Sequence, residues 1–418
     1  MTDALPARLR SARQDAARLR TVPTDVKNAV LREAARLLGE YRAPILAANA
    51  ADLAALDASS SAAFHDRLML DPARLDLAAR GLDAVARLPD PVGEEVDRRT
   101  LPNGLIARRV RSPLGVCLLI FESRPNVAIE SFSLALKSGN LLILRGGKES
   151  SRSVAALAGI IGEALEKCGL ARGSVWAVTD PDRELLKGLL SARQWIDVVI
   201  PRGGEALIEF VVTHSRIPII KNDRGLCHVY VHADADPQMA LAIVDNAKTQ
   251  RPGVCNAMET LLVHSQLAPA FLPLLHARLA GKGVEWACCP RSLALLPAAP
   301  GVRAAAPEDW DTEYLDLKMS CRVVDSLEDA IAHIEIHGSR HSEAIVTRSE
   351  PAARRFQDGI DAAVVYWNAS TRFTDGFELG LGGELGVSTQ KLHVRGPVGL
   401  RELTSVRWIV DGSGQTRA

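Results

Sequence analysis

The sequence has no net charge, no hydrophobic run long enough for a membrane and no regularly spaced cysteines, and each absence excludes a class of protein. Its 50 basic residues balance its 50 acidic residues, so no overall field attracts nucleic acid or an acidic membrane surface. Apolar runs such as residues 115–121 are far too short to span a bilayer. Residues 1–20 are rich in Arg and Ala, have no apolar centre and contain Asp3 and Asp15, which argues against a signal or transit peptide.

The cysteines are odd in number and lack C-x-x-C spacing, so we expect no disulfide framework. They stand at positions 117, 168, 227, 255, 288, 289 and 321. A reducing compartment, the cytoplasm, is the natural location for such a chain. His333, His337 and His341 recur every four residues, but Gly338 ends the predicted helix before His341. Because no cluster of Cys and carboxylate residues completes a tetrahedral site, we expect no metal.

The order of the predicted elements indicates the α/β class. Helical patterns fill most of residues 26–87. From 115 to 221, and again from 259 to 367, short apolar strands alternate with helices. Such alternation predicts two doubly wound lobes with parallel sheets, and ligand sites beyond the carboxyl ends of the strands. We expect residues 290–312 to form only a loose connection.

Residues 96–114 differ from their surroundings, because two extended segments flank Asn103-Gly104, the strongest short signal for a β-hairpin. The segment is locally basic but has no interleaved aromatic residues. This pattern favours a solvated or intersubunit ribbon over a nucleic-acid surface. A last strand is predicted at 405–410.

Cys255 is the strongest candidate for a nucleophile. Arg251-Pro252-Gly253 predicts a turn, and residues 260–263 predict a buried strand directly after the cysteine. A thiol between a Gly-rich turn and a strand can be partly exposed and surrounded by backbone N–H groups, which lower its pKa. The alternative, a small buried hydrophobic residue, stays open on this segment alone. Two α/β lobes joined near residue 254 would place Cys255 at the cleft between them, which favours the nucleophile.

Two basic, Gly-containing loops follow predicted strands of the first lobe. Arg145-Gly146-Gly147-Lys148 and Arg202-Gly203-Gly204 each precede a helix, where backbone N–H groups can face a phosphate. Neither matches G-x-G-x-x-G, and either alone is also compatible with a plain turn. Together they favour a dinucleotide, and Arg145 with Lys148 favours the 2′-phosphate of NADP.

Several longer segments resemble the aldehyde dehydrogenase superfamily and, within it, the γ-glutamyl phosphate reductase family. The matching segments are 111–116, 136–149 (LKSGNLLILRGGKE), 199–204 (VIPRGG), 246–263 (NAKTQRPGVCNAMETLLV), 324–345 and 366–399. The resemblance covers nearly the whole chain. It implies an aldehyde dehydrogenase-like fold of two doubly wound α/β lobes with a small β-ribbon for oligomerisation.

The resemblance implies a cytoplasmic enzyme of proline biosynthesis that reduces L-glutamyl 5-phosphate with NADPH to glutamate 5-semialdehyde and phosphate. Cys255, at the family's nucleophile position, would displace phosphate to give a thioester. The backbone N–H of Cys255 would help to stabilise the oxyanion. Ser123 stands where the superfamily has its oxyanion Asn, and Arg124 beside it suits an anionic acyl phosphate. Glu313 falls where the superfamily holds the nicotinamide ribose.

Asn222 stands where hydrolytic members of the superfamily have a Glu that activates water. A phosphorylating enzyme should lack this base, because water would destroy the thioester. For the glutamyl end of the substrate the candidates are Arg372, Arg251 and His393, since a carboxylate and a phosphate both need cationic donors. Each of them is equally compatible with a surface or intersubunit charge.

The resemblance also implies a division of the chain and a set of partners. The predicted division is 1–95 and 115–252 for the NADP-binding lobe, 253–370 for the catalytic lobe, 96–114 and 400–412 for the oligomerisation ribbon, and 371–399 for a Gly-rich return to the active site. We expect a homodimer or a pair of dimers, and no nucleic-acid or membrane partner. Whether a glutamate kinase passes the acyl phosphate on directly stays open.

Two rival functions remain at this stage. The first is a non-phosphorylating NAD(P) aldehyde dehydrogenase, which Asn222 disfavours. The second is a catalytically inactive scaffold on the same fold, which Cys255 and the loop at 145–148 disfavour.

Overall fold

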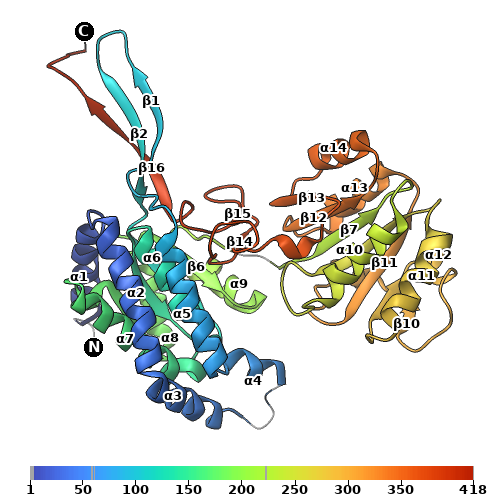
Figure 1. Ribbon diagram of the computed structural model, residues 1–418, viewed down its shortest axis with the longest axis horizontal. Helices are drawn as coiled ribbons and strands as arrows, with labels where there is room; N and C mark the ends of the chain where they lie inside the picture. The colour runs from blue at the N-terminus through green and yellow to red at the C-terminus, as the bar shows by residue number, and fades with distance from the viewer. Residues whose placement is uncertain (1–3, 58–59, 61, 222–223, 418) are drawn as a thin grey trace. The chain divides into compact units, whose positions relative to one another are not determined.

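A computed structural model describes residues 4–57, 60, 62–221 and 224–417 of the chain. The chain forms two compact units, each with its own parallel sheet (Figure 1). Unit 1 spans residues 1–222, 380–386 and 397–418, and unit 2 spans 223–379 and 387–396. Within the described residues, no helix is long and apolar enough to cross a membrane.

Among the described residues, unit 1 begins with five helices, of which the helical patterns in residues 26–87 predict the second, third and fifth. They are α1 (Ala4–Leu19), α2 (Thr24–Glu40), α3 (Arg42–Ala54), α4 (Ala62–Leu68) and α5 (Pro72–Arg87). Helix α2 buries Val30, Leu31, Ala34, Leu37 and Leu38, which recur at the helical period and therefore share one face. Helices α2 and α5 pack side by side, and α2 also packs against α7.

The sheet of unit 1 has four parallel strands in the order β5-β4-β3-β6. Its elements are β3 (Val116–Phe121), α6 (Val127–Lys137), β4 (Leu141–Arg145), η1 (Lys148–Ser150), α7 (Ser151–Lys167), η2 (Arg172–Ser174), β5 (Val175–Ala177), α8 (Arg183–Ser191), β6 (Val198–Arg202) and α9 (Glu205–His214). Every residue of β3 and β4 is buried, which explains their continuous apolar runs. The chain winds from β3 outward to β5 and then returns to the other side of β3. The switch point between β3 and β6 is where ligands bind in open α/β sheets.

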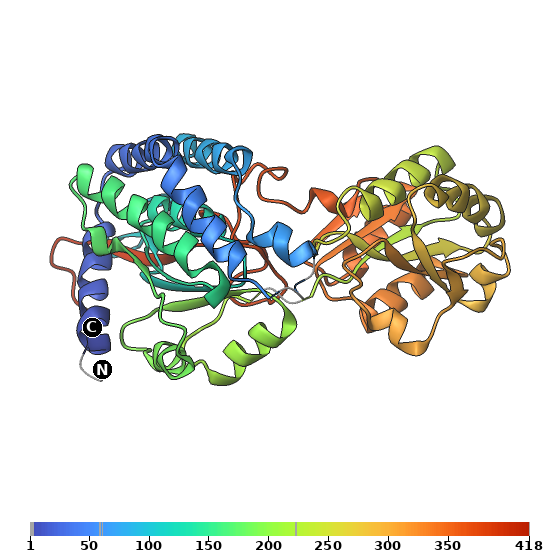
Figure 2. The same cartoon turned by 90° about the horizontal axis from the view of Figure 1, so that it is seen from below.

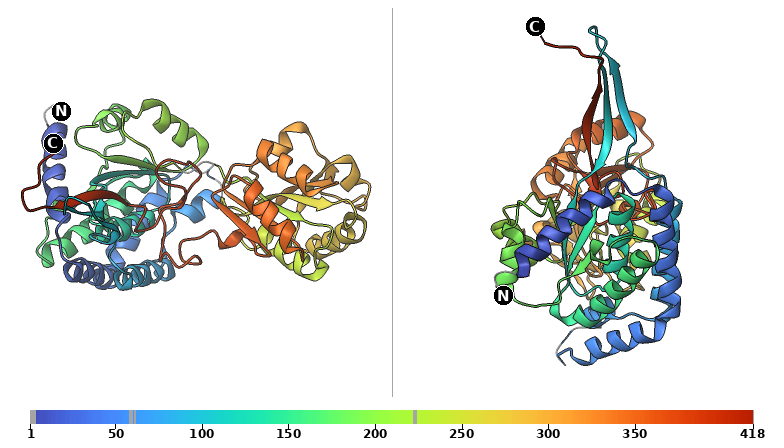
Figure 3. Two further views of the ribbon diagram at one scale, coloured as in Figure 1. Left: turned by 90° about the horizontal axis from the view of Figure 1, so that it is seen from above. Right: turned by 90° about the vertical axis from the view of Figure 1, so that its left-hand side faces the viewer.

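An antiparallel three-stranded ribbon projects from unit 1 (Figures 1 and 3). Its strands are β1 (Glu95–Thr100), β2 (Ile106–Pro113) and β16 (Thr404–Asp411), in the order β1-β2-β16. The predicted turn is present, and Gly104 adopts a φ of 84°, which glycine tolerates without strain. The last strand pairs with the predicted hairpin, with Pro113 opposite Thr404.

Unit 2 has a seven-stranded parallel sheet in the order β10-β9-β11-β8-β7-β12-β13. Its elements are β7 (Cys227–Val231), α10 (Pro237–Thr249), β8 (Met258–His264), α11 (Ala268–Ala280), β9 (Glu285–Cys288), α12 (Pro290–Leu293), β10 (Val302–Ala304), η3 (Pro307–Asp311), β11 (Lys318–Val324), α13 (Leu327–His337), β12 (Ser342–Val346), α14 (Glu350–Gly359), β13 (Val364–Trp367), η4 (Thr371–Phe373), β14 (Val387–Ser388) and β15 (Gly396–Pro397), of which Pro397 belongs to unit 1. Helices cover both faces of this sheet (Figure 2). Val229 and Val231 pack into the core with α10 and α11, whereas Tyr230 between them packs into the core with α13 and α14.

Three details differ from the sequence prediction. The compact units divide at residue 222, not at 252, because strand β7 pairs in the second sheet and helix α10 packs into the core beside it. Residues 290–312 are not merely a loose connection, since β10 pairs with β9 at the edge of that sheet. The predicted strand at 217–221 contributes only one isolated bridge, Ile219 to Val199.

Candidate active site

Cys255 is an exposed residue in the loop between α10 and β8. Helix α10 ends at Thr249, and turns at residues 252–257, which include the turn predicted at 251–253, lead into β8 at Met258. The cysteine therefore lies at the amino edge of the sheet of unit 2, because β8 leads away from it. The sequence rule that places ligands beyond the carboxyl ends of strands does not locate this residue.

Two neighbouring segments fix the backbone of Cys255. A Cβ atom at Gly225 would lie 1.8 Å from the carbonyl oxygen of Cys255, so only glycine allows the two backbones to approach this closely. The N–H of Gly225 donates to Oε1 of Glu313 at 2.8 Å. Glu313, predicted to bind the cofactor ribose, thus holds the loop before β7 that supports the nucleophile.

A buried polar layer lies directly beneath the cysteine. Cys227 donates its S–H to the carbonyl oxygen of Cys255 at 3.2 Å, and its sulfur lies 3.6 Å from Nδ1 of His341. Burial raises the pKa of Cys227 well above its ordinary value, and Glu343 and Cys255 raise it further. Cys227 is therefore a protonated donor and not a second thiolate. Burial also lowers the pKa of His341 to about 4, which keeps this histidine neutral.

A second buried pair is formed by His228 of β7 and Glu343 of β12, which lie opposite each other in the sheet. Oε2 of Glu343 accepts the backbone N–H of His228 at 2.7 Å and lies 3.0 Å from Nδ1 of the same residue. Burial raises the pKa of Glu343 and lowers that of His228 to about 3. Both shifts favour the uncharged forms, so the pair is a neutral hydrogen bond and not an ion pair.

Arg372 lies beside the cysteine loop, whereas the other substrate candidates differ in their surroundings. Arg372, half-buried in η4, donates from Nε to Gln250 at 2.9 Å and from Nη1 to the side-chain oxygen of Asn256. Arg251 is exposed in the same loop as Cys255. His393 is exposed in the segment between β14 and β15, where its carbonyl oxygen accepts a side-chain N–H of Gln390.

The predicted site residues that follow β3 and β6 lie at the switch point of the sheet of unit 1. Ser123 is buried, has a φ of 34° and donates its hydroxyl to Glu149 at 2.7 Å. Since a hydroxyl has one proton, stabilising an oxyanion would require this bond to break. Arg124 follows at the turn into α6. The N–H of Gly204 already bonds a carboxylate, Oε2 of Glu122 at 3.0 Å.

The loop after β4 contains the remaining cofactor candidates. Nη1 of Arg145 donates to the carbonyl oxygen of Gly146 at 2.7 Å, while its buried Nε has no partner among the described residues. Lys148 is exposed at the start of η1. A small indentation here is lined by Arg145, Gly146, Gly147, Ser151, Val154, Val178 and Thr179. The first N–H groups of α7, at Arg152 and Ser153, bond the carboxylate of Asp52.

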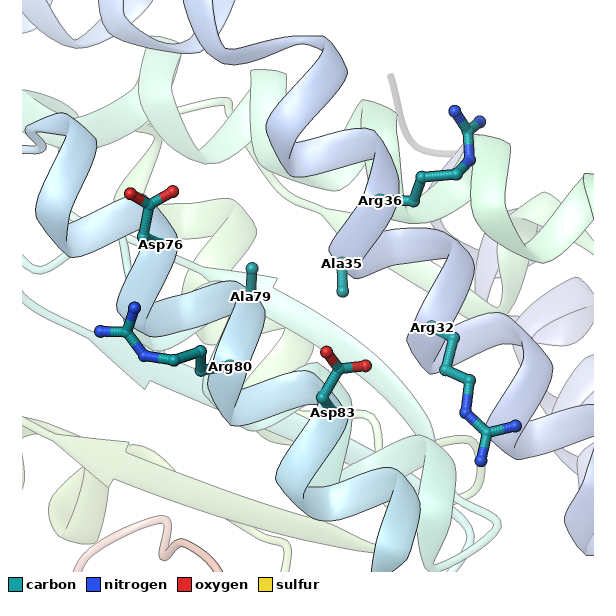
Figure 4. Close-up of a pocket in the computed structure, with 7 residues that line it drawn as sticks. All are labelled: Arg32, Ala35, Arg36, Asp76, Ala79, Arg80 and Asp83. Carbon is teal, nitrogen blue, oxygen red and sulfur yellow. The ribbon is translucent and has the colours of Figure 1, made fainter.

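A larger surface pocket of about 450 Å³ lies elsewhere, between α2 and α5 (Figure 4). It is lined by Arg32, Ala35, Arg36, Asp76, Ala79, Arg80 and Asp83. The pocket contains neither a nucleophile nor a Gly-rich loop, and its size alone gives it no chemistry. Among the described residues there is also no cluster of His, Cys, Asp and Glu that could hold a metal.

Residues 3–285 match the sequence model of the aldehyde dehydrogenase family. The chain belongs to this family. A gamma-glutamyl phosphate reductase of Moorella thermoacetica is 51% identical over 97% of both chains. The crystal structure of the Thermotoga maritima gamma-glutamyl phosphate reductase is similar over 100% of both chains, with 41% identity and a TM-score of 0.95. An acetylating aldehyde dehydrogenase of Geobacillus thermoglucosidasius shares the fold with a TM-score of 0.72 at 15% identity, over 99% of this chain and 97% of that one.

These comparisons confirm the family resemblance and the aldehyde dehydrogenase-like α/β fold that the sequence predicts. The chain is an oxidoreductase of this family, and the family implies a nicotinamide cofactor. The roles of the individual site residues stay predictions. Asn222 lies outside the described residues.

Sequence reasoning missed Asn256, Gly225 and Cys227 as parts of the site. Asn256 follows the predicted nucleophile directly, which is the only signal that the sequence offers for it. Gly225 and Cys227 gain their roles from contacts between loops that are distant in sequence.

Proposed function

We propose that this chain reduces L-glutamyl 5-phosphate to L-glutamate 5-semialdehyde and phosphate, using NADPH, in the cytoplasm. The exposed Cys255 on its tightly supported loop is the observation that carries the proposal. The similarity to reductases of this name over nearly the whole chain supports the choice of substrate. Seven cysteines without a disulfide, all within the described residues, support a reducing compartment.

The first step is attack by the Cys255 thiolate on the acyl carbon of the substrate. A carbon–sulfur bond forms, the carbon–oxygen bond to phosphate breaks, and the electron pair leaves with the phosphate. The product of this step is a thioester, which divides one hard conversion into two easier ones. The N–H of Cys255 stabilises the oxyanion during attack, and Ser123 assists if its bond to Glu149 opens.

Arg124, Arg251, Arg372 and His393 supply positive charge for the phosphate and carboxylate of the substrate. Arginine suits both groups because its planar guanidinium can donate two parallel hydrogen bonds. Asn222 offers no carboxylate to activate water, so the thioester persists until it is reduced.

The residues after β4 fit the adenosine end of NADPH. Two cations suited to a 2′-phosphate lie here: Arg145, whose buried Nε has no partner within the part of the chain that the structure describes, and the exposed Lys148. Asp52 already occupies the first amides of α7, so this helix terminus is not the pyrophosphate site. Gly203, Gly204 and Glu313 remain candidates for the rest of the cofactor. When bound, the reduced nicotinamide supplies the hydride that converts the thioester to the aldehyde.

The decisive assay runs the reaction backwards, as NADP-linked oxidation of glutamate 5-semialdehyde by the purified protein. We expect NADPH to form only when inorganic phosphate is present, and the Cys255→Ala variant to form none. Acid production without phosphate would instead support a non-phosphorylating aldehyde dehydrogenase. Equal NADPH formation by wild type and Cys255→Ala would refute the covalent mechanism.

A further inference from the structure

Two arginines and the nucleophile lie close together in unit 2. Arg251 precedes Cys255 in the same loop, and Arg372 bonds the side chain of Asn256, the residue after Cys255. Burial lowers the pKa of Arg372, and the positive charge of Arg251 lowers it further. Asp375 and Cys255 act in the opposite direction. The two guanidinium groups are therefore close enough to interact electrostatically, and Arg372 also interacts with the Cys255 thiol.

This site carries positive charge that no ion pair within the described residues neutralises, although the charge of Asp375 acts on Arg372. Among the described residues, neither Arg251 nor Arg372 forms an ion pair, and Nη2 of Arg372 has no hydrogen-bond partner. The groups that orient Arg372 are two neutral amide oxygens, from Gln250 and Asn256. A fixed guanidinium with unused N–H groups, next to a second cation, is a binding site for an anion.

Asn256 connects this guanidinium to the nucleophile loop. Its side chain is buried, and Nδ2 donates to the carbonyl oxygen of Thr374 at 2.8 Å. Its own carbonyl oxygen accepts the hydroxyl of Thr371 at 2.7 Å. Two hydroxyl contacts of Thr374, to Ser342 at 2.7 Å and to Tyr366 at 2.9 Å, anchor the same segment on the sheet. The position of Arg372 is thus set by the residue next to Cys255.

We infer that Arg372, assisted by Arg251, binds the phosphoryl group of the substrate and not the glutamyl carboxylate, and that Asn256 is the residue that positions it. This inference rests on the proposed function. The bond that breaks joins the phosphate to the carbon that Cys255 attacks, so the phosphate must lie beside the sulfur. The α-carboxylate is separated from that carbon by the length of the glutamyl chain. Negative charge grows on the departing phosphate, so the arginines stabilise the transition state more than the bound substrate.

The first test measures KM values in the phosphate-dependent oxidation of glutamate 5-semialdehyde. For Arg372→Ala we expect the KM for phosphate to rise at least about tenfold, as loss of a charge-assisted hydrogen bond predicts, with the KM for the semialdehyde within about twofold. Asn256→Ala should shift the same constant in the same direction by a smaller factor, and Arg372→Lys should recover part of the loss. Arg355→Ala, on the exposed face of α14, is the control and should change neither constant. A rise in the KM for the semialdehyde alone would overturn the assignment in favour of the carboxylate.

The second test needs no turnover. Alkylation of Cys255 is followed by mass spectrometry with the anionic reagent iodoacetate and the neutral reagent iodoacetamide. We expect the rate with iodoacetate, divided by the rate with iodoacetamide, to fall several-fold in Arg372→Ala and in Asn256→Ala. We also expect inorganic phosphate to slow alkylation of the wild type but not of these variants. An unchanged ratio, or phosphate protection that survives in Arg372→Ala, would refute the anion site. If the wild type shows the site but does not oxidise the semialdehyde, the proposed function fails and the anion site stands.

Discussion

At position 225 the backbone of one loop lies directly against the backbone that carries the nucleophile. We expect Gly225→Ala to displace the Cys255 loop and to lower kcat/KM by about a hundredfold, because misplacement by roughly 1 Å costs about that much. Turnover and the thermal midpoint should be measured together, with the alkylation rate of Cys255 as a local probe.

Gly281→Ala is the matched control for this change. It lies in the same unit and has a negative φ, and a Cβ added there would meet no atom within 4 Å, so full activity is expected. Wild-type kinetics in Gly225→Ala would contradict the role given to the close approach.

His341 makes the stability of unit 2 dependent on pH. Its pKa is lowered by burial to about 4, so between this value and its ordinary value of 6.5 the unfolded chain binds the proton and the folded chain does not. Stability is therefore present above pH 6.5 and is lost as pH falls toward 4. Between pH 7.5 and 5, we expect the free energy of unfolding of His341→Gln to fall by about 2 kcal/mol less than that of the wild type. Urea denaturation at both pH values measures this, and equal losses in the two proteins would exclude the linkage.

The sequence predicts Cys255 because a thiol between a turn and an apolar strand is a local pattern. It does not predict Asn256 or Cys227, because their partners come from segments that are distant in sequence. Asn256 bonds residues 371–374 and Cys227 bonds the carbonyl oxygen of Cys255, and neither pairing leaves a periodic signal.

Helix α10 and strand β8 are joined by a buried ion pair. Nζ of Lys248 lies 2.8 Å from Oε2 of Glu259, both side chains are fully buried, and burial raises the pKa of Glu259 to about 7 despite the lysine. We expect Lys248→Met to lower the free energy of unfolding by about 3–5 kcal/mol, because it leaves the carboxylate of Glu259 buried without its partner. Lys248→Met combined with Glu259→Met should recover most of that loss in urea denaturation. A double variant less stable than Lys248→Met would contradict this explanation.

At the scale of elements, periodicity predicts most helices and strands but not their membership of a unit. Strand β7 carries Cys227 and His228 among apolar residues, and the sequence alone does not show which sheet receives it. The apolar run at 217–221 resembles a strand, yet only Ile219 finds a bridge. Tertiary contacts decide which strands pair. They place the boundary between the units at residue 222 and not at the predicted 252.

At the scale of the whole molecule, we propose that the ribbon is the surface for self-association. Val406, Trp408 and Val410 alternate along β16, so they share one face, and all three are exposed. We expect light scattering to give a multiple of 45.0 kDa for the wild type and a mass near 45.0 kDa for the double variant Val406→Glu, Val410→Glu.

A control with the same change in charge uses the opposite face, as Ser405→Glu with Arg407→Gln, and should keep the wild-type mass. A wild type that already has the mass of one chain would refute association through the ribbon.

The pairing of β16 with β2 also has a consequence for synthesis on the ribosome. Strand β2 emerges early, whereas its partner β16 follows after all of unit 2 has been translated. Until then the backbone donors and acceptors along one side of residues 106–113 lack their pairing partner, β16. The nascent chain therefore carries an open sheet edge for most of its translation, which makes this segment the natural point for chaperone capture or for mispairing between neighbouring nascent chains.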